Sequence, residues 1–217
     1  MRLLFFGGRD PLLNLLLMLP GMLLALTLHE LAHGLVADHL GDPTARYAGR
    51  LTLNPLRHLD PLGTILLLLV GFGWAKPVPV DPRNFADRRR GMAAVGLAGP
   101  LTNFLLAFVL SFPLVYLQLV AGASLWERML SFAVIINVLL GIFNLLPVPP
   151  LDGSRILPAF LSPRAAYAFE LHEGWGYVVL LVLLLTGLLG NILVPLVYTT
   201  YGTMITTAAS ILSPFGR

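Results

Sequence analysis

Three residues near the start of the chain have the types and spacing of a catalytic metal site. They are His29, Glu30 and His33 of the motif His29-Glu30-Leu31-Ala32-His33. On a helix, residues four apart lie on one face, so both imidazoles can reach one ion while Glu30 stands beside them. Zinc lowers the pKa of a bound water to about 7, and a neighbouring carboxylate can take the proton and pass it to a leaving amine. The motif therefore predicts His29 and His33 as ligands and Glu30 as the general base of a hydrolase.

The apolar surroundings of this motif strengthen the prediction. Residues 15–28, just before it, are Leu, Met, Pro, Gly, Ala and Thr only. A charged residue at the centre of a membrane helix costs about 2.5–3.5 kcal/mol, and ionisable residues kept there are usually functional. The alternative is a buried polar patch that only joins helices by hydrogen bonds.

Two histidines do not complete a catalytic zinc site, which ordinarily has three protein ligands. His39 has the spacing of the metzincin pattern, but Val36 stands where that pattern has a glycine. On a continuing helix, His39 would point away from His33. His58 and His172 lie in predicted loops, and we expect both to be solvated.

Asp152 is the better candidate for the third ligand. Three prolines before it would unwind the chain, and Gly153 would let the backbone turn behind the carboxylate. Irregular backbone within a membrane is tolerated where it is buried in protein or lines a cavity. Alternatively, Asp152 could cap a short helix that extends to Leu161, because Asp is favoured at N-caps. The residues alone leave both interpretations open.

The composition is that of a polytopic membrane protein. Of the 217 residues, 57% are hydrophobic and 12% are charged, whereas soluble domains have roughly 45–50% and about 25%. Cysteine is absent, which excludes disulfides, thiolate ligands and a catalytic thiol. The net charge of +3 gives no indication of nucleic-acid binding, since positive residues beside membrane segments usually set topology.

The apolar runs predict an all-α polytopic membrane protein with about 4–6 transmembrane helices. Clear spans are expected at about Pro11 to His39, Met92 to Ala121 and Leu125 to Pro147. A last apolar stretch from Trp175 to Leu212, interrupted by Pro195, would supply one or two more.

Three shorter segments carry separate expectations. Met1 to Phe6 is expected to be an interfacial anchor. Polar and apolar residues alternate in Ala45 to Asn54, which predicts a short membrane-associated β segment whose edge could pair with an extended substrate. Pro61 to Trp74 is apolar but short for a span, which needs ~17–25 residues, so it could either cross or re-enter.

The position of Asp152 favours a re-entrant segment. Its carboxylate must lie at the depth of the histidines, and a full crossing by Pro61 to Trp74 would leave Asp152 on the opposite side. A re-entrant segment returns Asp152 to the side where His39 emerges. It also gathers the basic residues from Arg46 to Arg90 on one side, which would be cytoplasmic.

Taken together, these motifs resemble the site-2 protease family of intramembrane metalloproteases. Besides the His29 motif and Leu151-Asp152-Gly153, the matching motifs are Asn54-Pro55-Leu56, Gly73-Trp74-Ala75-Lys76-Pro77-Val78-Pro79, Gly99-Pro100-Leu101-Thr102-Asn103 and Asn144-Leu145-Leu146-Pro147. They extend over more than half the chain in this order. The resemblance implies that His29, His33 and Asp152 bind one Zn²⁺ per chain. It also implies that Glu30 is the general base of a zinc metalloendopeptidase.

The resemblance further implies a minimal form, without PDZ or CBS domains, in a bacterial or archaeal plasma membrane. Residues 1–217 would form a single membrane-embedded protease domain, with the motif-bearing core at about 11–161 and C-terminal helices at about 174–213. Its partners would be the lipid bilayer and transmembrane protein or peptide substrates, cleaved in or near their membrane segments. No nucleic-acid partner is expected, and the sequence does not specify an oligomeric state.

Asn144 and Asn103 are further candidates for the active site. An uncharged amide in an apolar span can orient a peptide carbonyl or stabilise a developing oxyanion. The alternative for each is an interhelical hydrogen bond worth about 0.6 kcal/mol. For Asn103 the hydrogen-bond interpretation has at least the same weight as the catalytic one.

The main alternative function is a polytopic metal-binding protein or transporter without protease activity. It would use the same polar residues as a cation path but would not need Glu30 between two histidines. A di-iron desaturase or hydroxylase would need more histidines than the five present. A catalytically inactive relative is disfavoured, because all four expected residues are present.

Overall fold

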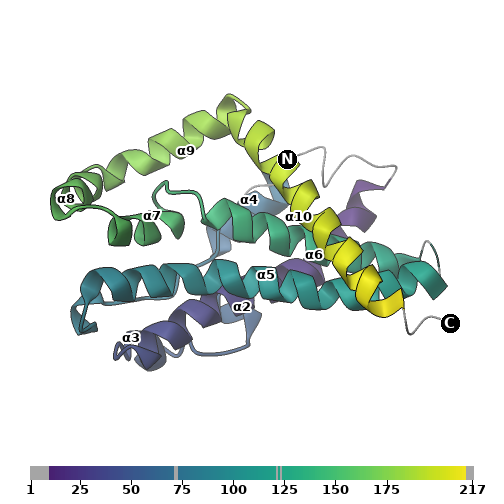
Figure 1. Cartoon of the computed structure of the whole chain (residues 1–217), viewed down its shortest axis with the longest axis horizontal. Coiled ribbons are helices and arrows are strands. Elements are labelled where there is room, and N and C mark those ends of the chain that lie inside the picture. Colours follow the sequence, from purple (N-terminus) through teal and green to yellow (C-terminus); the bar gives the residue numbers. More distant parts are fainter. Residues whose placement is uncertain (1–9, 71–72, 121, 123, 214–217) are drawn as a thin grey trace.

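Four long apolar helices dominate the computed structural model, which describes residues 10–70, 73–120, 122 and 124–213 (Figure 1). They are α2 (Pro11–His39), α5 (Arg88–Val120), α6 (Leu125–Asn144) and α10 (Leu188–Leu212). A bent pair, α8 (Pro163–Leu171) with Glu173–Leu185, could form a fifth span. These helices confirm an all-α membrane protein with four to five candidate spans. The interfacial anchor predicted at residues 1–6 lies outside the described residues.

Helices α2, α5 and α6 form the bundle that positions the site. Pro11 opens α2, where its missing N–H costs nothing. The Ser124 hydroxyl caps α6 by accepting the N–H of Glu127 at 3.2 Å. Gly21 of α2 packs so closely on α6 that a β-carbon there would lie 2.6 Å from Ala133 Cβ. Small residues at this crossing therefore let the two backbones approach.

The C-terminal helices break at a different residue from the one predicted. Pro195 lies inside α10, and the chain instead bends between α9 (Gly176–Leu185) and α10, as Figure 1 shows. Gly187 at the bend has a φ of 74°, a left-handed conformation that glycine adopts without steric cost. The prediction of an interruption at Pro195 was wrong, because membrane helices accommodate a proline when neighbouring groups satisfy the freed carbonyl.

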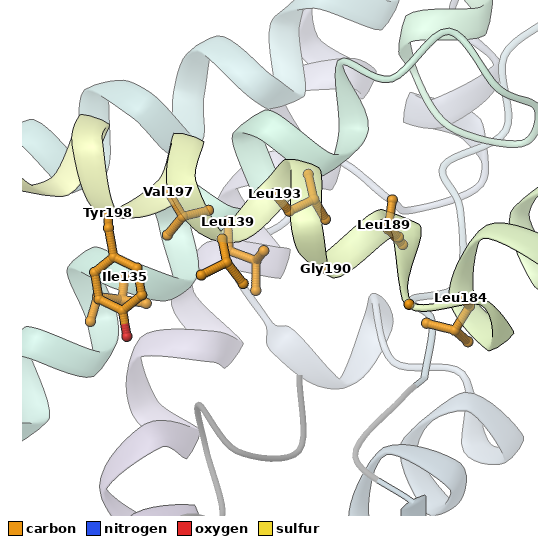
Figure 2. A pocket seen from close by; sticks show the side chains of 10 residues that line it. Ile135, Leu139, Leu184, Leu189, Gly190, Leu193, Val197 and Tyr198 are labelled. Carbon is orange, nitrogen blue, oxygen red and sulfur yellow. The ribbon is translucent and has the colours of Figure 1, made fainter.

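A small apolar pocket lies where α9 and α10 meet α6 (Figure 2). Its walls include Ile135 and Leu139 of α6, Leu184 of α9, and Leu193 and Val197 of α10. The pocket contains none of the residues singled out in the sequence, so the predicted site lies elsewhere.

The β segment predicted at residues 45–54 was wrong. The chain there forms the short helix α3 (Thr44–Tyr47) followed by turns, in which Arg50 N–H donates to the carbonyl of Ala45 at 2.9 Å. The alternation of polar and apolar residues has a tertiary cause. Arg50 is buried against another loop, whereas Leu51 packs against Gly34 of α2. No strand is present at 45–54 to pair with a substrate.

The two ends of the apolar segment at 61–74 lie side by side. It contains the helix α4 (Pro61–Val70), preceded by a short turn of helix, η1 (Pro55–Arg57). Leu59 and Ala75, on either side of the segment, form an isolated antiparallel bridge. Lys76 N–H also donates to the carbonyl of His58 at 2.9 Å. The chain therefore leaves this segment beside the point where it entered.

The following loop returns the chain to the end of α2. After a second short turn, η2 (Pro82–Asn84), Phe85 packs with Ala37 of α2 and Val95 of α5 in one buried cluster. The end of α2 and the start of α5 are thus neighbours. This places the middle of α5 across the histidine motif.

Candidate metal centre

Side chains from α2 and from the residue before α7 (Gly153–Ile156) converge at one buried point. The Nε2 atoms of His29 and His33 lie 3.0 Å apart. Oδ2 of Asp152 lies 3.0 Å from the first of these nitrogens and 3.1 Å from the second. The three residues are only 4–6% exposed. The structure therefore brings together the three ligands predicted from the sequence.

A tightly folded loop carries Asp152 to the histidines. A β-carbon at Gly153 would lie 2.3 Å from the carbonyl oxygen of Leu145, so only glycine fits where the chain folds back on the end of α6. The short helices α7 and η3 (Leu157–Phe160) follow. The Asp152 side chain makes no capping bond to α7. It faces the histidines, which disfavours the capping interpretation.

The second nitrogen of each imidazole fixes its tautomer. Nδ1 of His29 lies 2.6 Å from Oδ1 of Asn103, and Nδ1 of His33 lies 2.6 Å from the carbonyl oxygen of Val95. Both partners are acceptors, so each Nδ1 carries the proton and donates it. The Nε2 lone pairs are then directed at the same point, as in zinc sites whose histidines are oriented by outer hydrogen bonds.

This donor set fits a zinc ion. Two imidazole lone pairs and a carboxylate oxygen within 3.1 Å of one another repel unless a cation lies among them. Zinc takes such nitrogen and oxygen ligands at about 2.0–2.2 Å, and the observed separations are short enough for all three atoms to contact one ion. Two histidines and one carboxylate also leave a fourth position open, as in catalytic zinc sites.

Asn103 of α5 bonds to the predicted ligand His29 and connects α2 with α6. Its Nδ2 donates to the carbonyl of Ala25 at 3.3 Å and to Oδ1 of Asn137 at 2.9 Å. Asn137 in turn donates to the carbonyl of Ala133. Both amide protons of Asn103 are thereby used, which favours the interhelical interpretation. Its role as an oxyanion donor stays a prediction. Asn137 was missed, although an uncharged amide in the apolar sequence of α6 was a usable signal.

Gly99 lets α5 cross directly over the imidazoles. A β-carbon at this position would lie 2.5 Å from Nε2 of His33 and 2.5 Å from Cε1 of His29. Any side chain there would push the ligands apart. The sequence showed Gly99 only as part of a matching motif, because no local pattern reveals which helix a glycine will approach.

Glu30 and Asn144 have separate environments. Glu30, next to His29 on α2, is half-buried, and its Oε2 accepts the backbone N–H of Val78 at 2.9 Å. Asn144 donates from Nδ2 to the carbonyl of Leu140 within α6. It is not part of the His29–His33–Asp152 cluster. Its contact with substrate stays a prediction.

The other three histidines contribute no ligand to the cluster. His39 is exposed at the end of α2, and His172 is exposed with Nδ1 bonded to the carbonyl of Ala168. The expectation of a solvated His58 was wrong. The residue is 1% exposed, and its Nε2 lies 2.9 Å from the carbonyl oxygen of Thr52.

Apolar helices around two histidines, a carboxylate and an adjacent glutamate are the features of a membrane-embedded metalloprotease. Known proteins agree with this assignment. The family model of peptidase family M50 matches residues 113–186, which include Asp152. YwhC of Bacillus subtilis is 40% identical over 199 residues, covering 89% of this chain and 91% of YwhC. Its printed name describes it as a zinc metalloprotease by inference.

Two further relatives extend the comparison. Rip2 of Mycolicibacterium smegmatis, assigned in the same way, is 32% identical over 84% of this chain and 72% of its own length. MJ0392 of Methanocaldococcus jannaschii, named a zinc metalloprotease, is 29% identical over 81% of this chain but only 44% of that protein. No solved structure matches the chain. The chain belongs to peptidase family M50, the site-2 protease family of zinc metalloproteases.

Proposed function

We propose that the chain is a zinc-dependent endopeptidase of a bacterial or archaeal plasma membrane. It hydrolyses peptide bonds in or near the transmembrane segments of membrane protein substrates. The observation that carries this proposal is the convergence of His29, His33 and Asp152 inside a bundle of membrane-length helices. Zinc bound there supplies a Lewis acid that polarises a peptide carbonyl and makes water nucleophilic at neutral pH.

The chain's own residues hold the reacting groups and move the proton. Asn103 and the Val95 carbonyl keep both imidazoles turned toward Asp152. Glu30 has one carboxylate oxygen bonded to Val78, and its other oxygen makes no hydrogen bond to the residues that the structure describes. This second oxygen takes a proton from the attacking water and delivers it to the departing amine nitrogen, so one residue serves as base and then as acid.

The re-entrant interpretation of residues 61–74 is part of the proposal. The bridge between Leu59 and Ala75 supports it, because a segment that crossed the membrane would separate these residues by the thickness of the bilayer. His33 lies six residues before the end of α2, or about 9 Å along the helix axis. The site is therefore nearer the side that carries the basic residues from Arg46 to Arg90, which would be cytoplasmic.

The C-terminal helices would belong to the same protease domain as the motif-bearing core. Leu193 and Val197 of α10 pack in one buried cluster with Ala107 of α5 and Val138 of α6. A helix that buries its apolar face in this way supports a single unit over residues 1–217.

Cleavage of single-span peptides by purified protein tests the function. Wild type should cut within or beside the apolar segment of the peptide. Glu30→Gln should keep about one zinc per chain and lose cleavage by at least about 10²-fold. Asp152→Ala should lose both zinc and cleavage. Full cleavage by Glu30→Gln would reject the proposal. Cation flux that survives Glu30→Gln in a protein without cleavage would favour the transporter.

A further inference from the structure

A short extended segment lies against the predicted general base. We call residues 76–78 the strap. Val78, at its end, donates its backbone N–H to Oε2 of Glu30 at 2.9 Å. The Val78 side chain is buried, and a β-carbon on Gly34, the residue after His33, would lie 3.3 Å from its Cγ1. The strap thus packs on α2 beside the metal ligands.

A buried arginine holds this strap in place. Arg50 is 6% exposed. It donates from Nη2 to the carbonyl of Lys76 at 2.6 Å and from Nη1 to the carbonyl of Pro77 at 3.2 Å. Among the described residues Arg50 forms no ion pair. An arginine is rarely buried unless paired, and the proposed hydrolysis makes no direct use of this one.

The geometry of a guanidinium suits this task. It is planar, permanently charged and offers donors in a fixed fork, so it can hold two successive carbonyls in one set geometry, which the rotatable donors of an ammonium group do not impose. The strap has a second anchor, because Lys76 N–H donates to the carbonyl of His58. Pro77 and Pro79 on either side of Val78 fix their own φ angles and restrict the residues before them. The strap is therefore stiff, and both Arg50 and the carbonyl of His58 hold it.

We propose that Arg50 is a positioning residue for the hydrolytic reaction. It holds the strap so that the Val78 N–H fixes one oxygen of Glu30 and directs the other toward the water. A glutamate side chain has several rotamers, and a catalytic group displaced by 1 Å can lose about 10²-fold in rate. This inference rests on the proposed function, because the orientation of Glu30 matters only if Glu30 moves the proton.

Substitution of Arg50 tests the inference, with Arg46→Ala as the matched control. Arg46 lies in the neighbouring helix α3 and pairs with Asp38, without touching the strap. Arg50→Ala should lower kcat about 10–100-fold and leave KM and zinc content near wild type. Arg50→Lys should restore part of the loss, because its ammonium group keeps charged donors for these carbonyls but lacks the fixed fork. Lys76 and Pro77 are exposed, so water can replace the lost bonds and the variants can fold.

A second variant removes the donor itself. Val78→Pro deletes the N–H that Glu30 accepts and leaves both carbonyls that bind Arg50. Val78 precedes Pro79, so its backbone is already restricted to extended conformations. Val78→Pro should show the same loss of kcat at constant zinc content. If Arg50→Ala loses zinc, Val78→Pro decides, and wild-type kcat in that variant would overturn the proposal.

A disulfide distinguishes a fixed strap from a lid. The chain has no cysteine, so Leu59→Cys with Ala75→Cys introduces a single pair. Opposed residues of an antiparallel bridge have Cα atoms about 4.5–5.5 Å apart, within the disulfide range of about 4.4–6.8 Å. The oxidised enzyme should keep the kcat of its reduced form within about two-fold. Loss of activity on oxidation, recovered on reduction, would show that the strap must swing away and would overturn the inference.

Wild type and Glu30→Gln in the same assay separate the two proposals. A wild type that does not cleave, or a Glu30→Gln that does, rejects the proposed function. Cleavage by wild type, loss in Glu30→Gln and undiminished kcat in both Arg50→Ala and Val78→Pro reject only the role of Arg50.

Discussion

Asn103 and Asn137 share a hydrogen bond of 2.9 Å between α5 and α6, directly behind the metal centre. Both side chains are fully buried, and Asn103 also accepts the Nδ1–H of His29. Helix α6 contributes no predicted ligand, yet its Asn137 helps to orient the predicted ligand His29 through Asn103. The geometry of the centre therefore depends on the packing of α2, α5 and α6 together.

Asn103→Ala should weaken zinc binding by about 10–100-fold, the usual effect of losing a group that orients a ligand. His29 would lose the acceptor that fixes its tautomer. Competition against a chromogenic zinc chelator measures the affinity. Asn14→Ala is the matched control, because Asn14 also joins α2 to α6, through Arg128 Nη2 at 2.7 Å. It lies fifteen residues before His29, about 22 Å along the helix. Equal affinities in the two variants would contradict the prediction.

Gly99→Ala should abolish stoichiometric zinc binding. The new methyl group would lie 2.5 Å from Nε2 of His33, so either the imidazole or α5 must move. Overpacking of this kind typically costs about 1–3 kcal/mol as well. Gly190→Ala on α10 serves as the control, since a β-carbon there meets no atom within 4 Å. Zinc content by elemental analysis is the measurement, and a Gly99→Ala protein with one zinc per chain would show that α5 can shift without harm.

Local spacing was sufficient to predict the metal motif and the spans. His29, Glu30 and His33 share one helix, so a period of 3.6 residues places them correctly without tertiary information. The long apolar runs predicted α2, α5 and α6 to within a few residues. Asp152 is 119 residues from His33, and the residues alone left it between ligand and helix cap. The resemblance to a family decided its assignment.

Two of the three wrong predictions have a tertiary cause. The alternation at residues 45–54 indicated a strand, but Arg50 is buried because the carbonyls of Lys76 and Pro77 accept its protons. His58 is buried where its own carbonyl accepts the N–H of Lys76, a residue beyond the 61–74 segment. Pro195 suggested a break, whereas Gly187 provides it. The first two outcomes depend on a partner distant in sequence, and the third depends on which of several glycines takes the left-handed conformation.

The Asp42 carboxylate, just after α2, should make stability depend on acid pH. Burial alone would raise its pKa, but hydrogen bonds from Thr44, Asn84 and the backbone N–H of Asp81 outweigh burial and lower the pKa below its ordinary value. A carboxylate whose pKa is lowered in the folded state stabilises the fold above the unfolded pKa of about 3.9. That stabilisation is lost as the pH falls through the folded pKa.

Asp42→Asn should therefore be less stable than wild type at pH 7, by about 1.5–3 kcal/mol for hydrogen bonds to a charged group. The difference in Tm between the two proteins should shrink as the pH is lowered past about 4. Thermal unfolding in detergent across this range measures it. A difference that stayed constant or grew in acid would show that the Asp42 charge does not stabilise the loop.

Zinc removal should destabilise the protein through the metal centre alone. Two Nε2 lone pairs and the Asp152 carboxylate lie within 3.1 Å of one another, so a cation stabilises the folded state, while the unfolded chain has no such site. At a free zinc concentration 100 times the Kd, the gain is about 2.7 kcal/mol, which corresponds to a rise in Tm of about 5–10 °C for a chain of this size. A chelator should reverse this rise.

Asp152→Asn should lose most of the rise in Tm with zinc, whereas Asp87→Asn, the same exchange at an exposed residue, should keep it. An equal zinc response in Asp152→Asn and wild type would remove Asp152 from the ligand set.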